Sequence, residues 1–167
     1  MALWIAGEAA LSVVVVAALG WAARRQDASD QRRRGLRMGQ AMTVAVFFGI
    51  AMLHAGLTLG MGGGKLPVVI LCLILAVIGA ALGRVPPNAL VGVRTPWSLS
   101  SRLAWDRSNR LAGRLFLAVG LIGLAAAMVV DLRASMTLIT VSVLAAAAAS
   151  AFESCRVWRT DPERRLV

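Results

Sequence analysis

The sequence predicts an all-α fold, a polytopic bundle of transmembrane helices that forms one membrane domain over residues 1–167. Two properties of its composition predict this fold. Of the 167 residues, 59% are hydrophobic and only 16% are charged, whereas a soluble globular domain is roughly 45–50% apolar and about 25% charged. The formal net charge is nevertheless +10. A membrane protein accounts for both properties if its basic residues lie between the spans, so we expect no nucleic-acid partner.

Five apolar segments are long enough to cross a bilayer, which takes about 20 mostly apolar residues. They cover about residues 3–23, 38–60, 66–83, 115–130 and 134–152. The first segment precedes its nearest basic residues, whereas a cleaved signal peptide has basic residues before its apolar stretch. We therefore expect a retained first span.

The basic residues predict the orientation of these spans, because Lys and Arg concentrate in cytoplasmic loops. The loop after the first segment, the loop between the third and fourth segments and the C-terminal tail hold six, six and four of the 18 basic residues. Five alternating spans place all three of these regions on one face. The N-terminus is therefore expected outside and the C-terminus inside.

The spans contain few groups suited to chemistry. Glu8 and His54 are expected near the outer leaflet, where they could pair with each other. Cys72 lies in an apolar segment and Cys155 in the basic tail, so we expect neither a disulfide nor a cysteine metal site. The sequence shows no catalytic constellation and suggests no metal and no cofactor.

Residues 84–114 carry the most informative pattern of the chain. Pro86 and Pro87 end the third span, because proline lacks the amide proton and disfavours helix in the preceding residue. Gly92 permits backbone conformations that other residues resist. A helix can restart near Ser98, since a serine hydroxyl caps free amides. We expect an interfacial helix over about residues 98–113, with a stripe of arginines facing lipid phosphates.

This segment resembles the SdpI family of bacterial integral membrane proteins. The matching pattern begins at Asn88 and Gly92, continues as Val-Arg-Thr-Pro-Trp-Ser-Leu over residues 93–99, and ends with Trp105 and Asn109. The resemblance covers about residues 66–132, with a signature loop at 84–114. It implies a non-enzymatic, multi-pass protein of the bacterial cytoplasmic (inner) membrane. The founding member of the family confers immunity to a secreted toxin peptide and holds a cytosolic repressor at the membrane.

We predict that the signature loop binds a ligand or partner. The candidate residues are Asn88, Gly92, Arg94, Thr95, Pro96, Trp97, Arg102, Trp105 and Asn109. Arg94 is the strongest of them, because a planar guanidinium suits phosphate or carboxylate. The alternative is that these residues only fold a turn between two helices.

The leading functional hypothesis is a binding protein that confers resistance to a membrane-active peptide or relays its presence to a cytosolic regulator. One alternative is a transporter or channel subunit, although the polar residues of the spans are few. Another is a membrane enzyme that binds a lipid headgroup and uses Asp106 as its acid or base. Gly56-x-x-x-Gly60 and Gly79-x-x-x-Gly83 allow helices to approach closely, either within one chain or in a homo-oligomer.

Overall fold

The computed structural model describes residues 7, 11, 13–18, 20–21, 30–60, 64–87 and 91–164. The helices in this part of the chain are α2 (Asp30–Thr58), α3 (Leu66–Leu82), α4 (Pro96–Ser100), α5 (Arg102–Val129) and α6 (Leu132–Thr160). These residues contain no strand, so the predicted all-α fold is confirmed. Most of the predicted first span, including Glu8, lies outside the described residues.

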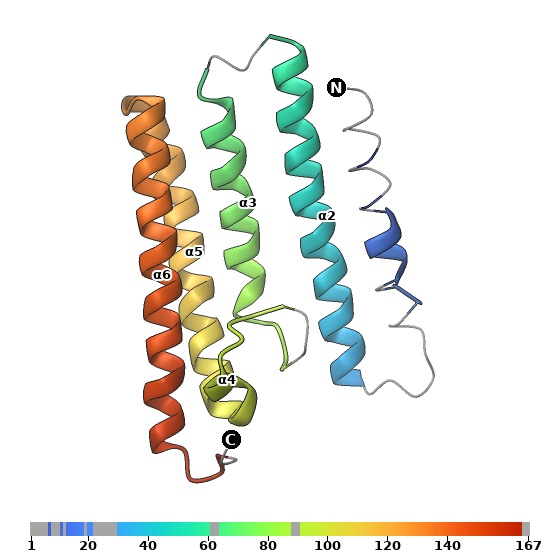
Figure 1. The fold of residues 1–167 in the computed structure, drawn as a ribbon, viewed down its shortest axis with the longest axis vertical. Helices are drawn as coiled ribbons and strands as arrows, with labels where there is room; N and C mark the ends of the chain where they lie inside the picture. Colours follow the sequence, from blue (N-terminus) through green and yellow to red (C-terminus); the bar gives the residue numbers. More distant parts are fainter. Residues whose placement is uncertain are drawn as a thin grey trace.

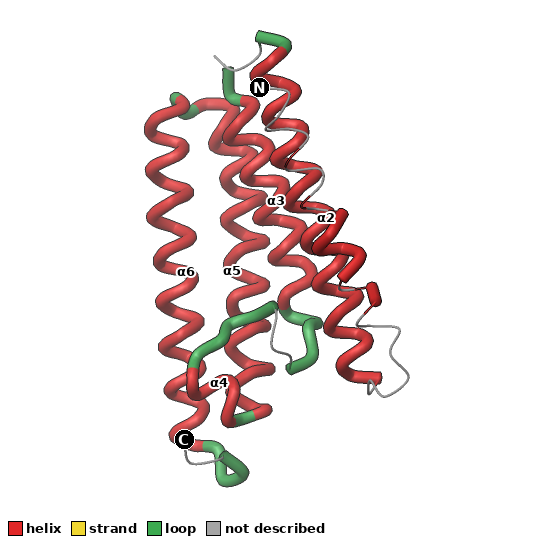
Figure 2. The backbone as a smooth tube through the Cα atoms, turned by 45° about the vertical axis from the view of Figure 1, so that its right-hand side comes forward, coloured by secondary structure: helices red, strands yellow, loops and turns green. Residues whose placement is uncertain are grey.

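The four long helices run alternately up and down, side by side (Figure 1). α3 packs against α2 on one side and more extensively against α5 on the other, and α6 packs against α5. The start of α2, the loop between α3 and α5, and the end of α6 lie at the same end of the bundle, as Figure 2 also shows. The described arginines of the three basic regions therefore meet at this end, which we call the basic end.

The helices have the length and surface of a membrane protein. Stretches Gly35–Thr58, Arg102–Val129 and Leu132–Thr160 are long and apolar enough to cross a bilayer, whereas α3 has 17 residues and so spans about 25 Å. Large apolar side chains face outward, with Phe48 67% and Ile122 68% exposed. Lipid solvates such a surface, so the predicted membrane character is confirmed.

The predicted interfacial helix over residues 98–113 does not form a separate element, and that prediction is wrong. α4 ends at Ser100, and residues 102–113 are the first turns of α5, which continues to Val129. Ser101 breaks the helix with an extended backbone (φ −142°, ψ 123°), and its hydroxyl accepts from the Ala104 amide to start α5. No proline follows in α5, so nothing interrupts the backbone before the apolar half of the helix.

Glycines set the close packing of α3 against α5. A Cβ on Gly79 would lie 2.2 Å from the Leu117 amide nitrogen, and a Cβ on Gly113 would lie 2.8 Å from the Gly79 carbonyl oxygen. Neither position can hold a side chain without separating the two backbones. Gly79-x-x-x-Gly83 therefore serves packing within the chain. Gly60, by contrast, lies in a turn with φ +78° and nothing near its Cβ position.

The two cysteines are both free thiols, as predicted. Cys72 is buried in α3, where its sulfur lies 2.6 Å from the Cβ position of Gly123. Cys155 is partly exposed in the last turns of α6. His54 lies in α2 and is partly buried; its predicted pairing with Glu8 lies outside the described residues.

Candidate functional site

Two buried side chains of α5 fix the loop that follows α3. Trp105 is fully buried, and its indole Nε1 donates a 3.0 Å hydrogen bond to the Val85 carbonyl. Asn109 is 1% exposed, and its Oδ1 accepts a 2.8 Å hydrogen bond from the Val93 amide. Its Nδ2 donates to the Trp105 carbonyl at 3.0 Å. α5 therefore bonds to the loop at both Val85 and Val93.

Gly92 completes this arrangement for two reasons. Its φ of +132° is a conformation that residues with a Cβ rarely adopt. A Cβ there would also lie 2.6 Å from the Asn109 Oδ1 and 2.8 Å from the Trp105 ring. Gly92, Trp105 and Asn109 thus pack together, and we call these three residues the loop clamp.

Thr95 and Ser98 attach the end of the loop to α6. Thr95 caps α4 in a reciprocal capping box with Ser98, and Pro96 occupies the first turn, where its missing amide proton costs nothing. The Thr95 hydroxyl also lies 2.7 Å from the hydroxyl of Ser154, which is fully buried in α6. The Thr95–Ser154 contact therefore fixes the start of α4 to α6.

A second hydrogen bond joins the start of α5 to the end of α6 at the basic end. The Ser101 hydroxyl donates to the carboxylate of Asp161, the residue that follows α6. This hydrogen bond, together with a further one from the Glu163 amide, lowers the pKa of the Asp161 carboxyl below its usual range. Asp161 lies beyond the membrane-spanning part of α6, and its charged form is the one that this contact favours.

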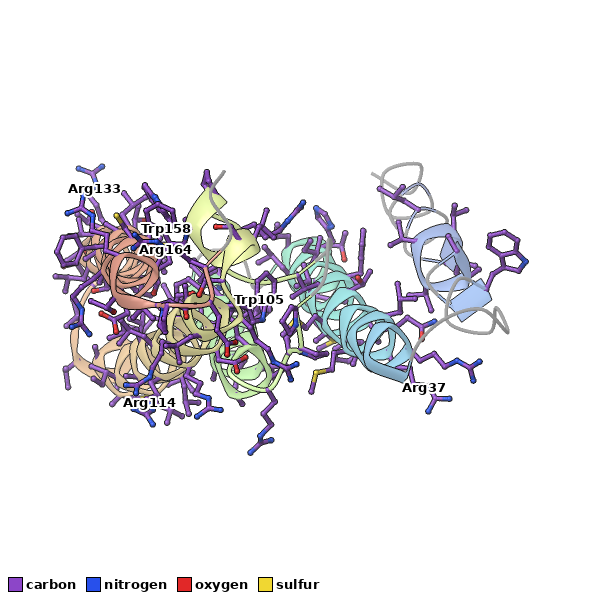
Figure 3. The ribbon with its side chains drawn as sticks, turned by 90° about the horizontal axis from the view of Figure 1, so that it is seen from below. Arg37, Trp105, Arg114, Arg133, Trp158 and Arg164 are labelled. Carbon is purple, nitrogen blue, oxygen red and sulfur yellow. The ribbon has the colours of Figure 1, made fainter. Side chains whose placement is uncertain are left out.

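Two hollows open beside the loop clamp. The arginine groove lies between the start of α2, the end of α3 and the start of α5, and has a volume of about 730 Å³. It is lined by Arg37, Met38, Gly83, Arg84, Val85, Pro86, Pro87, Arg102, Asp106 and Arg110. Figure 3 views the molecule from the basic end, with Trp105 in the interior and Arg37 at the outer edge.

The tryptophan notch lies between α4 and α6 and has a volume of about 550 Å³. Trp97 lines one side of it, and α6 contributes Ala151, Phe152, Cys155, Arg156, Arg159 and Thr160. Arg156 makes a bidentate ion pair with Glu153 in the same helix, with both N–O distances at 2.8 Å. Arg159 makes no ion pair within the described residues.

Comparison with known proteins identifies the segment that carries the loop clamp. Residues 84–154 match the SdpI/YfhL protein family. The resemblance predicted from the signature loop is thereby confirmed. No curated protein and no solved structure is significantly similar to the chain.

The segment that matches the SdpI/YfhL family begins just after α3 and includes α4, α5 and most of α6. It contains both partners of the Thr95–Ser154 contact and the whole of the loop clamp. The long apolar helices are those of an integral membrane protein, and residues 84–154 are the part of it that is similar to the SdpI/YfhL family.

The structure divides the predicted site residues into two groups. Gly92, Trp105 and Asn109 form the loop clamp, and Thr95 and Pro96 start α4, so these five shape the backbone. Three others present side chains at the surface: Arg94 and Arg102 are exposed, and Trp97 is partly exposed. Asn88 lies outside the described residues.

The surface-facing candidates do not share one site. Arg102 lines the arginine groove and Trp97 lines the tryptophan notch, whereas Arg94 lines neither. Sequence reasoning did not single out Arg37, Arg84 and Arg110 as site residues, although the predicted topology places their regions on one face. Their convergence in the arginine groove depends on the packing of α2 against α3.

Proposed function

We propose that this protein is a non-enzymatic protein of the bacterial inner membrane that binds a membrane-active peptide at its basic end and protects the cell against it. The observation that carries the proposal is the tryptophan notch. Trp97 is the signature-loop residue whose ring borders a hollow, and the loop clamp and the Thr95–Ser154 contact fix the helix that carries it. The match to the SdpI/YfhL family supports a role in immunity.

The chemistry of the notch suits an amphipathic peptide. Phe152 is 71% exposed, and together with Trp97 it offers aromatic surface to an apolar side chain. Arg159 at the same hollow offers a guanidinium for a peptide carboxylate. Apolar and basic groups side by side match the two faces of such a peptide.

The proposal places the basic end in the cytoplasm, with the N-terminus outside and five passes in total. The concentration of arginine at one end supports this orientation through the positive-inside tendency. A peptide that inserts into the bilayer and reaches the inner interface would then meet the notch.

Peptide protection is tested by expressing the chain in a sensitive bacterium and measuring the inhibitory concentrations of a panel of membrane-active peptides. We expect the unaltered protein to raise the inhibitory concentration of at least one peptide, and Trp97→Ala to lose that protection. Leu103→Ala is the matched control, because Leu103 is 44% exposed nearby on α5 and lines neither hollow. Immunoblots of membranes confirm equal amounts of each variant.

Protection against no peptide in the panel, or equal protection by Trp97→Ala, would refute this function. Relay to a cytosolic regulator is the second candidate, and the exposed side chain of Leu99 (56%) on α4 favours it. In that case Leu99→Asp would abolish a change in transcript levels that the unaltered protein causes, while peptide protection stays as it is.

Transport has less support among the described residues. Thr43, Thr137 and Thr140 lie in the long helices, where each hydroxyl donates to the carbonyl four residues earlier in its own helix. These hydroxyls bond to carbonyls of their own helices and so give no support to a transport path.

A further inference from the structure

The arginine groove gathers positive charge that forms no ion pair within the described part of the chain. Arg37 comes from α2, Arg84 follows α3, and Arg102 and Arg110 come from α5. Asp106 is the one acidic residue in the groove lining. Within the described residues none of the four arginines makes an ion pair. Four guanidinium groups around one carboxylate favour an external anion, because like charges at close range repel.

The geometry of the groove suits a phosphate group. A guanidinium presents a planar set of donors that bind phosphate oxygens in pairs. The arginines project from three separate segments, so an anion between them can be contacted from several sides. A volume of about 730 Å³ accommodates more than a single inorganic ion.

A further hollow, distinct from the tryptophan notch, continues from the groove along the helices. This furrow between α3 and α5 has a volume of about 410 Å³ and shares Gly83, Arg84 and Arg110 with the arginine groove. Its remaining lining is Gly79, Ala80, Gly113, Arg114 and Leu117. Gly79 lies one helical turn before Gly83, so the furrow leads from the basic end toward the apolar part of the bundle.

We propose that the arginine groove binds the phosphate of an anionic phospholipid, with one acyl chain lying along the furrow between α3 and α5. A free phosphate would use the arginines alone, whereas a lipid uses both hollows, and their continuity favours the lipid. The groove lies on the α2 and α3 side of α5, away from the tryptophan notch between α4 and α6. Lipid binding is therefore independent of the proposed peptide protection.

Retention of lipid by the purified protein tests this proposal. The full chain is reconstituted in nanodiscs of phosphatidylcholine with a minor fraction of phosphatidylglycerol, released into mild detergent, and analysed by native mass spectrometry. We expect selective retention of phosphatidylglycerol. The double variant Arg102→Gln/Arg110→Gln should lower that retention roughly thirtyfold, from the usual contribution of an arginine near an anionic lipid.

The matched control is Arg94→Gln/Arg107→Gln, which removes the same charge from the basic end. Both arginines are exposed and neither lines the groove; Arg107 lies near enough to Glu153 on α6 to affect its charge. The control should retain phosphatidylglycerol as the unaltered protein does. Equal losses in both double variants would overturn the proposal in favour of general surface charge. Circular dichroism in phosphatidylcholine nanodiscs identifies variants that keep their helices.

A further pair of variants separates a lipid from a free phosphate. Ala80→Phe fills the furrow from an exposed position on α3, and Ala118→Phe adds the same side chain to α5 outside the furrow. We expect only Ala80→Phe to weaken retention of phosphatidylglycerol. If Ala80→Phe retains it fully, or if inorganic phosphate alone displaces it, the acyl-chain contact is absent and the lipid assignment fails. If the unaltered protein shows no selective retention of phosphatidylglycerol but still protects against a peptide, this inference is overturned and the proposed function stands.

Discussion

Removing the Asn109 side chain should release the signature loop while the transmembrane helices stay folded. Asn109→Ala deletes the acceptor of the Val93 amide and the donor to the Trp105 carbonyl. A buried polar group that loses its partner costs about 1–3 kcal/mol. The Val93 bond joins Asn109 to the loop and not to another long helix, so this cost lowers the free energy of local opening rather than that of global unfolding.

The expected effect is large enough to measure residue by residue. At about 1.4 kcal/mol per tenfold change, a loss of about 1–3 kcal/mol speeds amide exchange through local opening by roughly 5- to 150-fold. Hydrogen–deuterium exchange with mass spectrometry, in detergent, should show this acceleration over residues 91–100 and no change in the middle of α3. Ser108→Ala is the control, because Ser108 is equally buried but its hydroxyl bonds only to the Trp105 carbonyl in its own helix.

Two outcomes would refute this reasoning. If exchange over residues 91–100 is unchanged in Asn109→Ala, the loop does not depend on the clamp. If Ser108→Ala accelerates it to the same extent, loss of any buried polar group in α5 is sufficient, and the Val93 bond has no special role.

Two further predictions follow from contacts at the helix interfaces. Gly79→Val should lower the free energy of unfolding of the bundle by about 1–3 kcal/mol, the usual cost of overpacking, because its Cβ would lie 2.2 Å from the Leu117 amide nitrogen. Unfolding by sodium dodecyl sulfate should show this loss. Ala118→Val, on the exposed face of α5, should show little loss. Acidification should loosen the turn after α6. The folded-state pKa of Asp161 is depressed by the Ser101 hydroxyl, so its stabilising contribution is present above the ordinary value of 3.8 and is lost as the pH falls below it; exchange of residues 161–164 should accelerate in that range, and Ser101→Ala should flatten the dependence.

The sequence was sufficient for the parts of the fold that depend on local composition. The apolar segments predicted at 38–60 and 66–83 match the cores of α2 and α3 to within a few residues at their C-terminal ends. Hydropathy predicts such helices well, because a bilayer requires every backbone group to bond within its own helix. Hydropathy gives no signal for where a helix begins or ends outside the hydrocarbon region. α5 begins at Arg102, well before the predicted span at 115–130.

The candidate site was harder to predict, because a tryptophan or asparagine in a loop motif has the same sequence signal whether it faces solvent or the interior. Trp105 is buried because Val85 and Gly92 of the loop lie against it, together with Met42 of α2 and Leu82 of α3. Asn109 is buried because the Val93 amide, sixteen residues away, approaches its side chain. Both contacts depend on the path of a loop that no periodic pattern specifies.

Some residues of the signature pattern shape the loop and others face the surface, so similarity in this pattern does not by itself predict a ligand. The residues of the signature pattern that point inward specify the loop conformation, so relatives that share them are expected to share the clamp. Arg37, in contrast, belongs to α2 and lies outside the matched segment 84–154. The arginine groove is complete only where α2 carries a cation next to the loop. Binding of an anion at the groove is therefore a property to be tested in this chain by its own arginines, and the loop clamp alone does not predict it in a relative.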